Sequence, residues 1–512
     1  MLKKNLSLLI IIFLFQCFPP FVPKKKKPDN VPLLLLAVAS QNRGSCSGFF
    51  VRSFFTDESE CRSFNRVGTG TNVEIFEQAG IDMQRQFSSS NFSYSKIVTE
   101  FDNIIYPKLL ASIGTPTDID NNKKITILVY DIGFGIGGYV DPINFLADDP
   151  SDSTGRSNQK EILYIDASTL LEIRRKNLSA NLPDPFLSTI AHEFQHLIRF
   201  RYELGFSNVI RTFDDITNTS FIFDDTWINE GTSEIASDIA GYGPQYSRMS
   251  CFRGDPTSGC TNGSTGISLF NWRGSIRNYS SAYTFLSYLY NVSGLTETDR
   301  NTFLKATTQG NVGNRGSTIT SLMSLFQTTA PRFNSTILGT DSTGMFKRLY
   351  ASFLAQAFNP ARYPAATSTL FLGSTNLGAM TNLYTTYPLP VGLNPIHTFS
   401  SAFGIVKGSN FVLEPSMFYR VSENSAVAPS GEDAVKVWNQ NNVTFGPEFI
   451  IFNGKLDTNS ILTSGNLLSR SSQIQMDADS CPRSYSKKYY EKNAIRNSLR
   501  ENLTFTICDK LE

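Results

Sequence analysis

The amino-acid sequence predicts an α+β fold with a mainly β C-terminal region. Two alternating, β-branched stretches predict strands, KKITILVYDI at Lys123–Ile132 and EILYID at Glu161–Asp166. Apolar residues at helical spacing follow at roughly 185–204, 225–240 and 279–292. From about residue 365, short apolar runs are broken by Gly, Pro, Asn and Ser, which indicates strands and turns.

The composition is that of a large folded protein without a marked charge. The chain has 512 residues, 40% of them hydrophobic, so it can bury a large core. This length suggests roughly two to four domains. The formal net charge is +1 and charged residues make up 18%, with no long basic stripe. Capture of nucleic acid by charge is therefore not indicated.

The N-terminus has the features of an export signal. Two lysines precede a short apolar stretch, Leu6–Phe15, which has signal-peptide length and is too short for a membrane span. Leu14-Phe15-Gln16-Cys17 resembles the lipobox of bacterial lipoproteins, in which the cysteine is acylated. Gln16 departs from the small residue usual there. The alternatives are a signal cleaved elsewhere, such as after Ala37-Val38-Ala39, and an uncleaved anchor.

The lipoprotein interpretation divides the chain. Residues 1–16 are the predicted signal peptide, and residues 17–41 hold the lipidated Cys17 and a tether whose lysines can lie against anionic headgroups. Residues 42–364 and 365–512 are the two expected domains. The predicted location is the cell envelope, anchored by lipid at the membrane surface, or the secreted fraction.

The seven cysteines agree with export. Without Cys17 they fall into three sequence-local pairs: Cys46 with Cys61, Cys251 with Cys260, and Cys481 with Cys508. Six cysteines allow many pairings, so the sequence alone does not fix the connectivity. Local pairing is the simplest arrangement in an oxidising compartment, and none of the spacings is C-x-x-C.

Two glycine- or acid-rich motifs resemble ligand sites but lack a necessary part. Gly133–Gly138 matches G-x-G-x-x-G, but Pro142 stands where a phosphate-binding helix would grow, so we expect a glycine-rich turn. Asp118–Asn122, DIDNN, has oxygen ligands at calcium-like spacing. Neither the glycine nor the distal glutamate of an EF-hand loop completes it. We expect a solvated turn there.

The segment HEFQH, His192–His196, contains two of the three histidines. Their spacing in a helical pattern places both imidazoles on one face, one turn apart, where both can reach one zinc ion. Glu193 can reach a water on that ion and act as general base. The alternative is that the two histidines only cap or fill a core.

A catalytic zinc needs a third protein ligand and an open position for water. The metzincin extension is missing, because Arg199 and Tyr202 stand where it requires glycine and histidine. The remaining histidine, His397, lies far along the chain in the β-rich region. The better source is the second helical pattern.

This helix, Trp227–Gly241, carries Glu230, Glu234 and Asp238 on one face. Such a stripe is often a solvated face, but the flanking isoleucines and tryptophan indicate a packed helix, in which buried acids need cations or donors. We expect Glu230 to ligate the metal. Glu234 and Asp238 would support the ligands, with Glu234 accepting the free ring N–H of a ligating histidine.

HEFQH followed by WINEG resembles the gluzincin metallopeptidases, such as thermolysin and the zinc aminopeptidases. The resemblance implies that His192, His196 and Glu230 hold one catalytic Zn²⁺ and that Glu193 is the catalytic acid/base. Where thermolysin has an aspartate four residues beyond its glutamate ligand, this chain has Glu234.

Within that clan, roughly residues 70 to 300 are similar to the hyicolysin family of secreted peptidases. The similarity is carried by the zinc segments and by the stretches at 101–132 and 157–166. It implies a zincin-type metallopeptidase domain in residues 42–364, with a mixed sheet followed by active-site helices. The stretch 200–225 is longer than its thermolysin counterpart and resembles an inserted loop.

The clan also implies a hydrogen-bond donor for the oxyanion. Asn278–Gly294 resembles an aminopeptidase helix that opens with a tyrosine in this role, which points to Tyr279, with Tyr283 in reserve. The alternative is an aromatic helix face in the core. His397 is a weaker candidate. The clan's fold further implies that EILYID is the edge strand beside the cleft, where an extended substrate can pair.

The sequence thus predicts a zinc-dependent peptidase acting on proteins or peptides. The lack of a G-x-M-E-N motif favours an endopeptidase over an aminopeptidase. One alternative is a surface-exposed binding or adhesion lipoprotein on a peptidase fold, with the zinc structural or lost. Another is hydrolysis of a non-protein amide. The presence of every proposed ligand and of Glu193 argues against a dead site.

Overall fold

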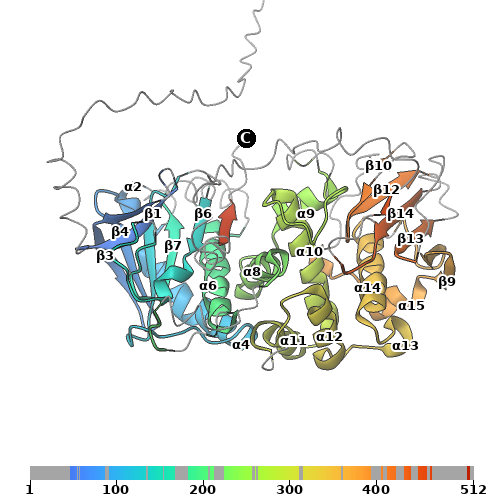
Figure 1. Cartoon of the computed structure of the whole chain (residues 1–512), viewed down its shortest axis with the longest axis horizontal. Coiled ribbons are helices and arrows are strands. Elements are labelled where there is room, and N and C mark those ends of the chain that lie inside the picture. Colours follow the sequence, from blue (N-terminus) through green and yellow to red (C-terminus); the bar gives the residue numbers. More distant parts are fainter. Residues whose placement is uncertain are drawn as a thin grey trace, which may run out of the picture. The chain divides into compact units, whose positions relative to one another are not determined.

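The structure, a computed structural model, describes residues 46–463 and 504–507 (Figure 1). The first range excludes residues 55, 57, 87–91, 134–135, 154, 168–182, 204, 206–207, 213–223, 256–259, 261–262, 311–314, 359–360, 394–404, 407–411, 423–431, 440–447 and 458–461. The predicted signal peptide, Cys17, the tether, His397 and the pair Cys481 and Cys508 lie outside the described residues. Among the helices that are described, none has the length and apolar character of a membrane span.

A six-stranded mixed sheet forms the N-terminal part, in the order β16-β6-β7-β5-β4-β3. Its strands are β3 (Phe64–Thr69), β4 (Val73–Gln78), β5 (Ile125–Tyr130), β6 (Ile136–Val140), β7 (Ile162–Asp166) and β16 (Thr504–Ile507). β4, β5 and β7 are parallel, whereas β3, β6 and β16 run antiparallel to their neighbours. Every residue of β5 and β7 is buried, as in strands covered on both faces. The two predicted strands are confirmed.

The prediction that EILYID is an edge strand is wrong. β7 lies between β5 and β6, because the segment expected to be only a glycine-rich turn continues as a strand. Gly133 does adopt a left-handed φ of 78°, but Gly138 belongs to β6. The outer edge of β6 pairs with β16, the red arrow beside it in Figure 1, with Thr506 opposite Gly138.

One helical stretch precedes β5 and contains a π-helical turn. It consists of α3 (Tyr94–Glu100), the π segment η2 (Phe101–Ile105) and α4 (Tyr106–Ser112). Pro107 lacks the N–H that a regular α-helix would use, and its ring would crowd the preceding turn. The wider turn lets the chain pass this proline, and the Tyr106 N–H donates to the Phe101 carbonyl instead.

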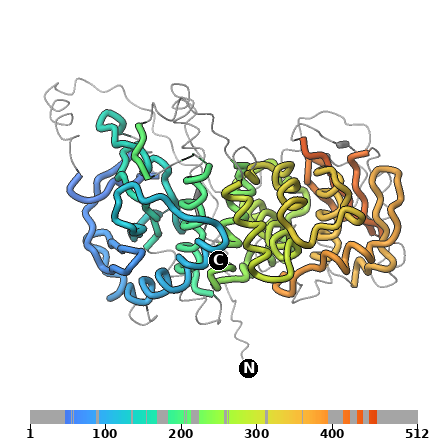
Figure 2. The backbone as a smooth tube through the Cα atoms, turned by 90° about the horizontal axis from the view of Figure 1, so that it is seen from below, coloured from blue at the N-terminus to red at the C-terminus, as the bar shows by residue number. Residues whose placement is uncertain are grey.

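The helices that follow form a layer between the N-terminal sheet and a second, C-terminal sheet, as the green and yellow segments show in Figures 1 and 2. The main ones are α6 (Pro185–Glu203), α8 (Thr226–Ala240), α9 (Tyr246–Arg253), α10 (Ile276–Ser293), α11 (Glu297–Gln309), α12 (Ile319–Thr329) and α14 (Ser342–Ala357). Short helices elsewhere in the chain are α2 (Met83–Gln86), η3 (Pro142–Phe145), α13 (Ser335–Leu338), α15 (Thr381–Thr386) and η5 (Val391–Leu393). The three helices predicted from apolar spacing are α6, α8 and α10. The last begins earlier than expected, at Ile276, because Ser275 caps it.

The C-terminal sheet confirms the predicted change to strands. Its order is β10-β12-β14-β13-β8-β9. The strands are β8 (Ser368–Leu372), β9 (Thr375–Ala379), β10 (Ile405–Val406), β12 (Phe418–Ser422), β13 (Ala434–Asn439) and β14 (Glu448–Asn453). Two small sheets pair β1 (Phe49–Ser53) with β2 (Glu58–Arg62) and β11 (Val412–Leu413) with β15 (Leu462–Thr463).

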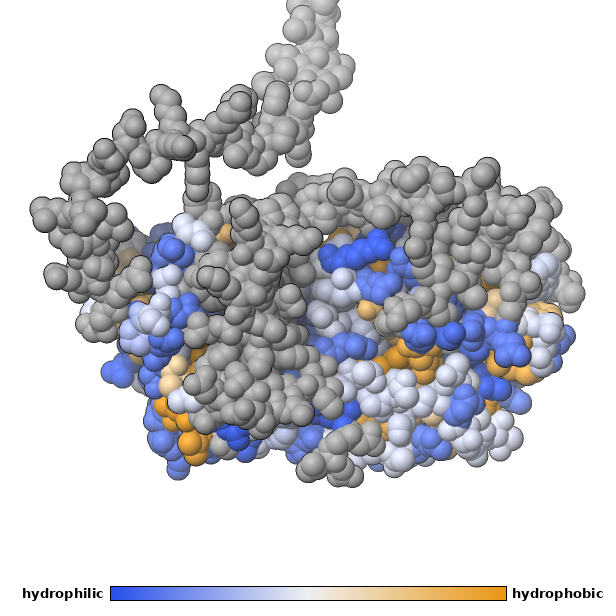
Figure 3. Space-filling view, viewed as in Figure 1, coloured by the Kyte–Doolittle hydropathy of each residue, from blue (hydrophilic) through white to orange (hydrophobic). Residues whose placement is uncertain are grey.

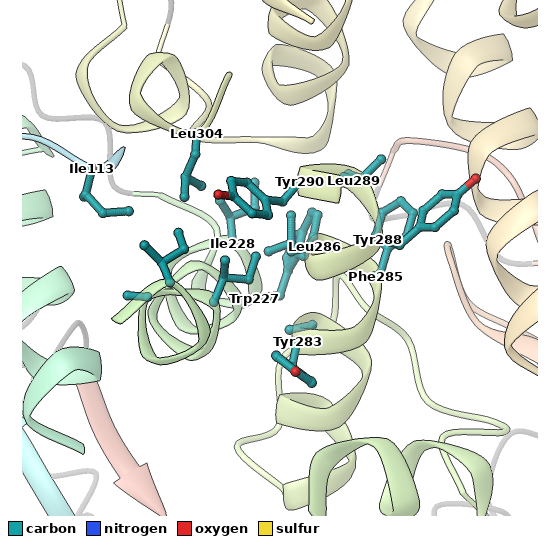
Figure 4. Close-up of a cluster of buried hydrophobic side chains, with 14 of the residues drawn as sticks. Ile113, Trp227, Ile228, Tyr283, Phe285, Leu286, Tyr288, Leu289, Tyr290 and Leu304 are labelled. Carbon is teal, nitrogen blue, oxygen red and sulfur yellow. The ribbon is translucent and has the colours of Figure 1, made fainter. Parts of the chain in front are cut away.

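One hydrophobic cluster extends from Val73 to Phe452 and joins the helical layer to both sheets. Within it, α8 packs against α10 through Trp227, Ile228 and Leu286 (Figure 4). The domain boundary that we expect near residue 365 stays a prediction. Residues on both sides of it belong to this one hydrophobic cluster. Two of the predicted disulfides are present, Cys46–Cys61 and Cys251–Cys260.

The described surface is mostly polar. Large hydrophobic side chains that are exposed are scattered, as in the face shown in Figure 3, where apolar areas are small and interspersed with hydrophilic ones. They are Val209, Tyr246, Leu295, Leu377 and Val391. Scattered apolar residues of this kind are normal on a protein surface.

Candidate metal centre

Helix α6 carries the HEFQH segment in the interior of the protein. It begins with Pro185, whose missing N–H costs nothing in a first turn, and the Asp184 carboxylate accepts a hydrogen bond from the Phe186 N–H. The helix contacts β6 and β7 on one side and α8 on another, so even its polar residues are buried. His192, Glu193 and His196 are at most 2% exposed.

Helix α8 brings the WINEG segment against α6. Gly231 lets α8 approach α10, because a Cβ at this position would lie 2.9 Å from the Ala282 carbonyl oxygen. Gly241 ends the helix in a left-handed conformation with φ of 98°, as its position in the sequence predicts. Glu230 is buried and faces His192 and His196.

The three predicted ligands converge through one atom each. The two imidazole Nε2 atoms are 3.1 Å apart, and Glu230 Oε2 lies 3.4 Å from His192 Nε2 and 3.6 Å from His196 Nε2. Ligands at zinc distances on a tetrahedron are separated by about 3.3–3.4 Å. The geometry therefore fits one zinc ion bound by three protein atoms, with a fourth position free for water.

The electrostatics of the centre also fit a cation. Glu230 Oε2 is buried and accepts no hydrogen bond from the described residues. Burial alone would raise the pKa of Glu230, but the two imidazoles beside it lower that pKa to about 2. Burial together with the charge of His192 lowers the pKa of His196 below its usual value, which keeps that imidazole neutral and able to ligate.

The Nδ1 atoms of the two histidines have different surroundings. His196 Nδ1 lies 2.9 Å from Asn229 Oδ1, so Asn229 fixes the ring with Nε2 toward the other ligands. His192 Nδ1 lies 3.9 Å from Glu234 Oε1, beyond hydrogen-bond distance, and Arg248 Nε is closer to that oxygen, at 3.1 Å. Glu234, which we expected to accept the ring N–H of a ligating histidine, thus lies near His192 Nδ1 but not within hydrogen-bond distance. At His196, Asn229 accepts this hydrogen bond instead.

Sequence reasoning missed Asn229 and Arg248. Asn229 immediately precedes Glu230 in WINEG, and this position could have indicated that its side chain lies at the site. Arg248 comes from α9, and no spacing in the sequence links it to the centre. Two further buried contacts join the helices: Gln195 accepts a hydrogen bond from Ser233 at 2.5 Å and donates one to Thr232 at 2.8 Å.

Asp238 and Tyr283 form a separate pair further along α8. The Tyr283 hydroxyl donates to Asp238 Oδ2 at 2.7 Å and accepts from the Gln245 N–H at 3.0 Å. Burial raises the pKa of Asp238 to about 8, with the charge of Glu234 adding to it. Both hydrogen-bonding directions of this hydroxyl are in use, which counts against Tyr283 as an oxyanion donor.

Tyr279 lies in the first turn of α10 and is buried. Its ring contacts Trp272, with centroids 4.8 Å apart, and the Arg248 guanidinium lies 5.4 Å from its centroid. Since Arg248 also contacts Glu234, Tyr279 is connected to the side chains around His192. His397, the weaker candidate, lies outside the described residues.

Glu193 lies next to β6. A Cβ at Gly138 would come within 3.0 Å of Glu193 Cγ and 2.9 Å of Thr189 Cγ2, so only a glycine lets the strand approach Glu193 this closely. β6 therefore passes directly beside the Glu193 side chain.

Comparison with known proteins agrees with this chemistry. No family model matches the sequence. The neutral metalloprotease ShpI of Staphylococcus hyicus is 26% identical over 282 residues, which are 53% of this chain and 55% of that protein. The chain thus spans about half the length of this relative. A donor set that fits a metal ion and similarity to a metalloprotease are the two findings that bear on function.

Proposed function

We propose that the protein is a zinc-dependent peptidase of the gluzincin type that cleaves proteins or peptides. The observation that carries this proposal is the convergence of His192 Nε2, His196 Nε2 and Glu230 Oε2 within 3.6 Å of one another. The similarity to a metalloprotease supports it. Likeness to the hyicolysin family remains the resemblance drawn from the sequence.

The chain's own residues would divide the reaction between them. When bound, zinc polarises a carbonyl and lowers the pKa of a water molecule. Glu193 takes the proton from the attacking water and passes it to the leaving amine. Tyr279 is the proposed donor to the oxyanion, and Asn229 holds the His196 ring in its ligating orientation.

The substrate is proposed to bind as an extended strand along β6. β6 passes beside Glu193, and a substrate strand on its outer edge would take the place of residues 504–507, which pair there in the structure. Main-chain pairing of this kind suits the interior of a polypeptide and favours an endopeptidase. Export with a lipid anchor at Cys17, or secretion, remains the proposed location.

Three variants of the full-length protein test this proposal through zinc content and casein hydrolysis. Glu193→Gln should keep zinc and lose at least about 10²-fold of the activity. His196→Ala should lose both. The control is Asn291→Ala, which should keep both zinc and activity. Among the described residues, the Asn291 side chain donates a hydrogen bond only within its own helix, α10.

Three outcomes would contradict the proposal. Wild-type protein without bound zinc would mean that the zinc is lost, as in the alternative of a surface-exposed binding lipoprotein on a peptidase fold. Glu193→Gln with normal cleavage would remove the general base from the mechanism. Zinc binding without hydrolysis of any protein, but with hydrolysis of small amides, would favour the non-peptide alternative.

A further inference from the structure

The loop between α4 and β5 folds around a group of carboxylates. Asp118 and Asp120 lie in it at partly buried positions, and Asn121 and Lys123 adopt positive φ values of 55° and 59°. The loop turns back on itself, because the Lys123 N–H donates to Asp118 Oδ1 at 2.9 Å. The left-handed residue that glycine supplies in an EF-hand loop is thus supplied here by Lys123.

A third carboxylate reaches this loop from another strand. Parallel pairing of β5 with β7 places Glu161 directly beside it, with the Thr126 N–H donating to the Glu161 carbonyl at 2.8 Å. Glu161 is 1% exposed, and its Oε1 accepts from the Ile119 N–H at 2.9 Å. Its Oε2 is buried and accepts no hydrogen bond from the part of the chain that the structure describes.

The three acids bring one oxygen each close together. One oxygen from each of Asp118, Asp120 and Glu161 lies within 4.8 Å of the other two. Ligands on opposite sides of a calcium ion are up to about 5 Å apart, so three oxygens within this limit can share one such ion. The donor atoms are all oxygen, which disfavours zinc.

A lysine partly balances this charge. Lys160 Nζ forms an ion pair with Asp120, and its side chain is 30% exposed. Three carboxylates and one ammonium leave a net charge of −2 at a partly buried position. A divalent cation would neutralise that charge, and the partly exposed lysine can swing into solvent when the cation binds.

We propose that Asp118, Asp120 and Glu161 form a calcium site that joins the loop before β5 to the start of β7. The sequence predicts only a solvated turn here, because the segment Asp118–Asn122 by itself lacks a further carboxylate ligand. In the fold, Glu161 of the neighbouring strand supplies that carboxylate. Water from the exposed side would fill the remaining positions around the ion.

The site has a structural consequence for the metal centre. The same loop holds the end of α6: the Asp118 N–H donates to Asn208 Oδ1 at 3.1 Å, and Arg201 Nη1 donates to Thr115 Oγ1 at 3.0 Å. An ion that stiffens the loop therefore stabilises the helix that carries His192 and His196.

Calorimetry and thermal unfolding test the proposal on the full chain with zinc retained and with Glu193→Gln introduced to prevent self-cleavage. CaCl₂ should bind at one site per chain and raise the Tm by a few degrees, and MgCl₂ should do so far less. Asp118→Asn and Glu161→Gln should each weaken calcium binding at least about tenfold. Glu297→Gln, which removes an exposed carboxylate on α11, should change nothing.

Lys160→Ala separates a calcium site from a structural ion pair. It should tighten calcium binding, because it removes the cation that competes for Asp120, whereas loss of a merely structural pair would only lower the Tm. The proposal is overturned if calcium up to about 10 mM neither binds nor shifts the Tm. It is equally overturned if binding is the same in Asp118→Asn, Lys160→Ala and the parent chain. None of these readouts depends on peptidase activity.

Discussion

Replacing Asn229 by alanine should weaken zinc binding about tenfold while the fold stays intact. Removing the outer hydrogen-bond partner of a ligating histidine usually costs about 10- to 100-fold in metal affinity. The smaller figure applies here, because Ser233 Oγ lies 3.1 Å from the same His196 Nδ1 and can replace part of the lost contact. Tenfold corresponds to about 1.4 kcal/mol.

The assay is competition for zinc between the protein and a chromophoric chelator, with circular dichroism to check folding. Asn229→Asp keeps an oxygen acceptor in place and should retain the wild-type affinity. The double variant Asn229→Ala with Ser233→Ala should approach a hundredfold loss, because both polar neighbours of His196 Nδ1 are then gone. An Asn229→Ala protein that is folded and binds zinc within about twofold of wild type would refute the assigned role.

Three further predictions concern groups around the centre. Gly138→Ala should lower kcat/KM at least about tenfold with zinc still bound, because the new Cβ would lie 3.0 Å from Glu193 Cγ. Tyr279→Phe should lower kcat about 10²-fold without zinc loss, whereas Tyr283→Phe should mainly lower the Tm, because its hydroxyl donates to Asp238. Asp238→Asn should be more stable than wild type in urea at pH 9. The raised pKa of Asp238, from 3.8 to about 8, makes the wild type lose stability as the pH rises between these values.

Each of these predictions has a contrary outcome. Full activity in Gly138→Ala would mean that β6 can move away from the base without cost. An unchanged kcat in Tyr279→Phe would transfer the oxyanion role to Tyr283 or His397. A stability difference between Asp238→Asn and wild type that is constant from pH 4 to pH 9 would show that Asp238 is ionised in the folded protein.

The closeness of the two histidines could be predicted because their relation along the chain is local. His192 and His196 lie one helical turn apart, so the sequence alone places them together, and Glu230 was found through its motif. The contacts of Asn229 and Arg248 could not be predicted in this way. Which side chains meet His196 or Glu234 depends on how α6, α8 and α9 cross, and no spacing encodes this.

The sheet shows the same limit. The alternation in EILYID predicts a strand, but its place in the sheet depends on the pairing of Gly138 and its neighbours, which lack the side chains that mark a strand. Likewise, DIDNN is incomplete when read along the chain, because Glu161 joins it only through the parallel register of β5 and β7. Contacts between distant segments decide both cases.

The position of β16 affects how any partner could reach β6. Residues 504–507 already pair with the outer edge of this strand, and Thr506 lies opposite Gly138, which is next to Glu193. A peptide that adds to this edge must first displace them. Its apparent affinity is the intrinsic affinity multiplied by the fraction of molecules with an open edge, so an edge open in about 1% of molecules weakens binding about a hundredfold. Substrate capture and release of the chain's last strand would then be one coupled equilibrium.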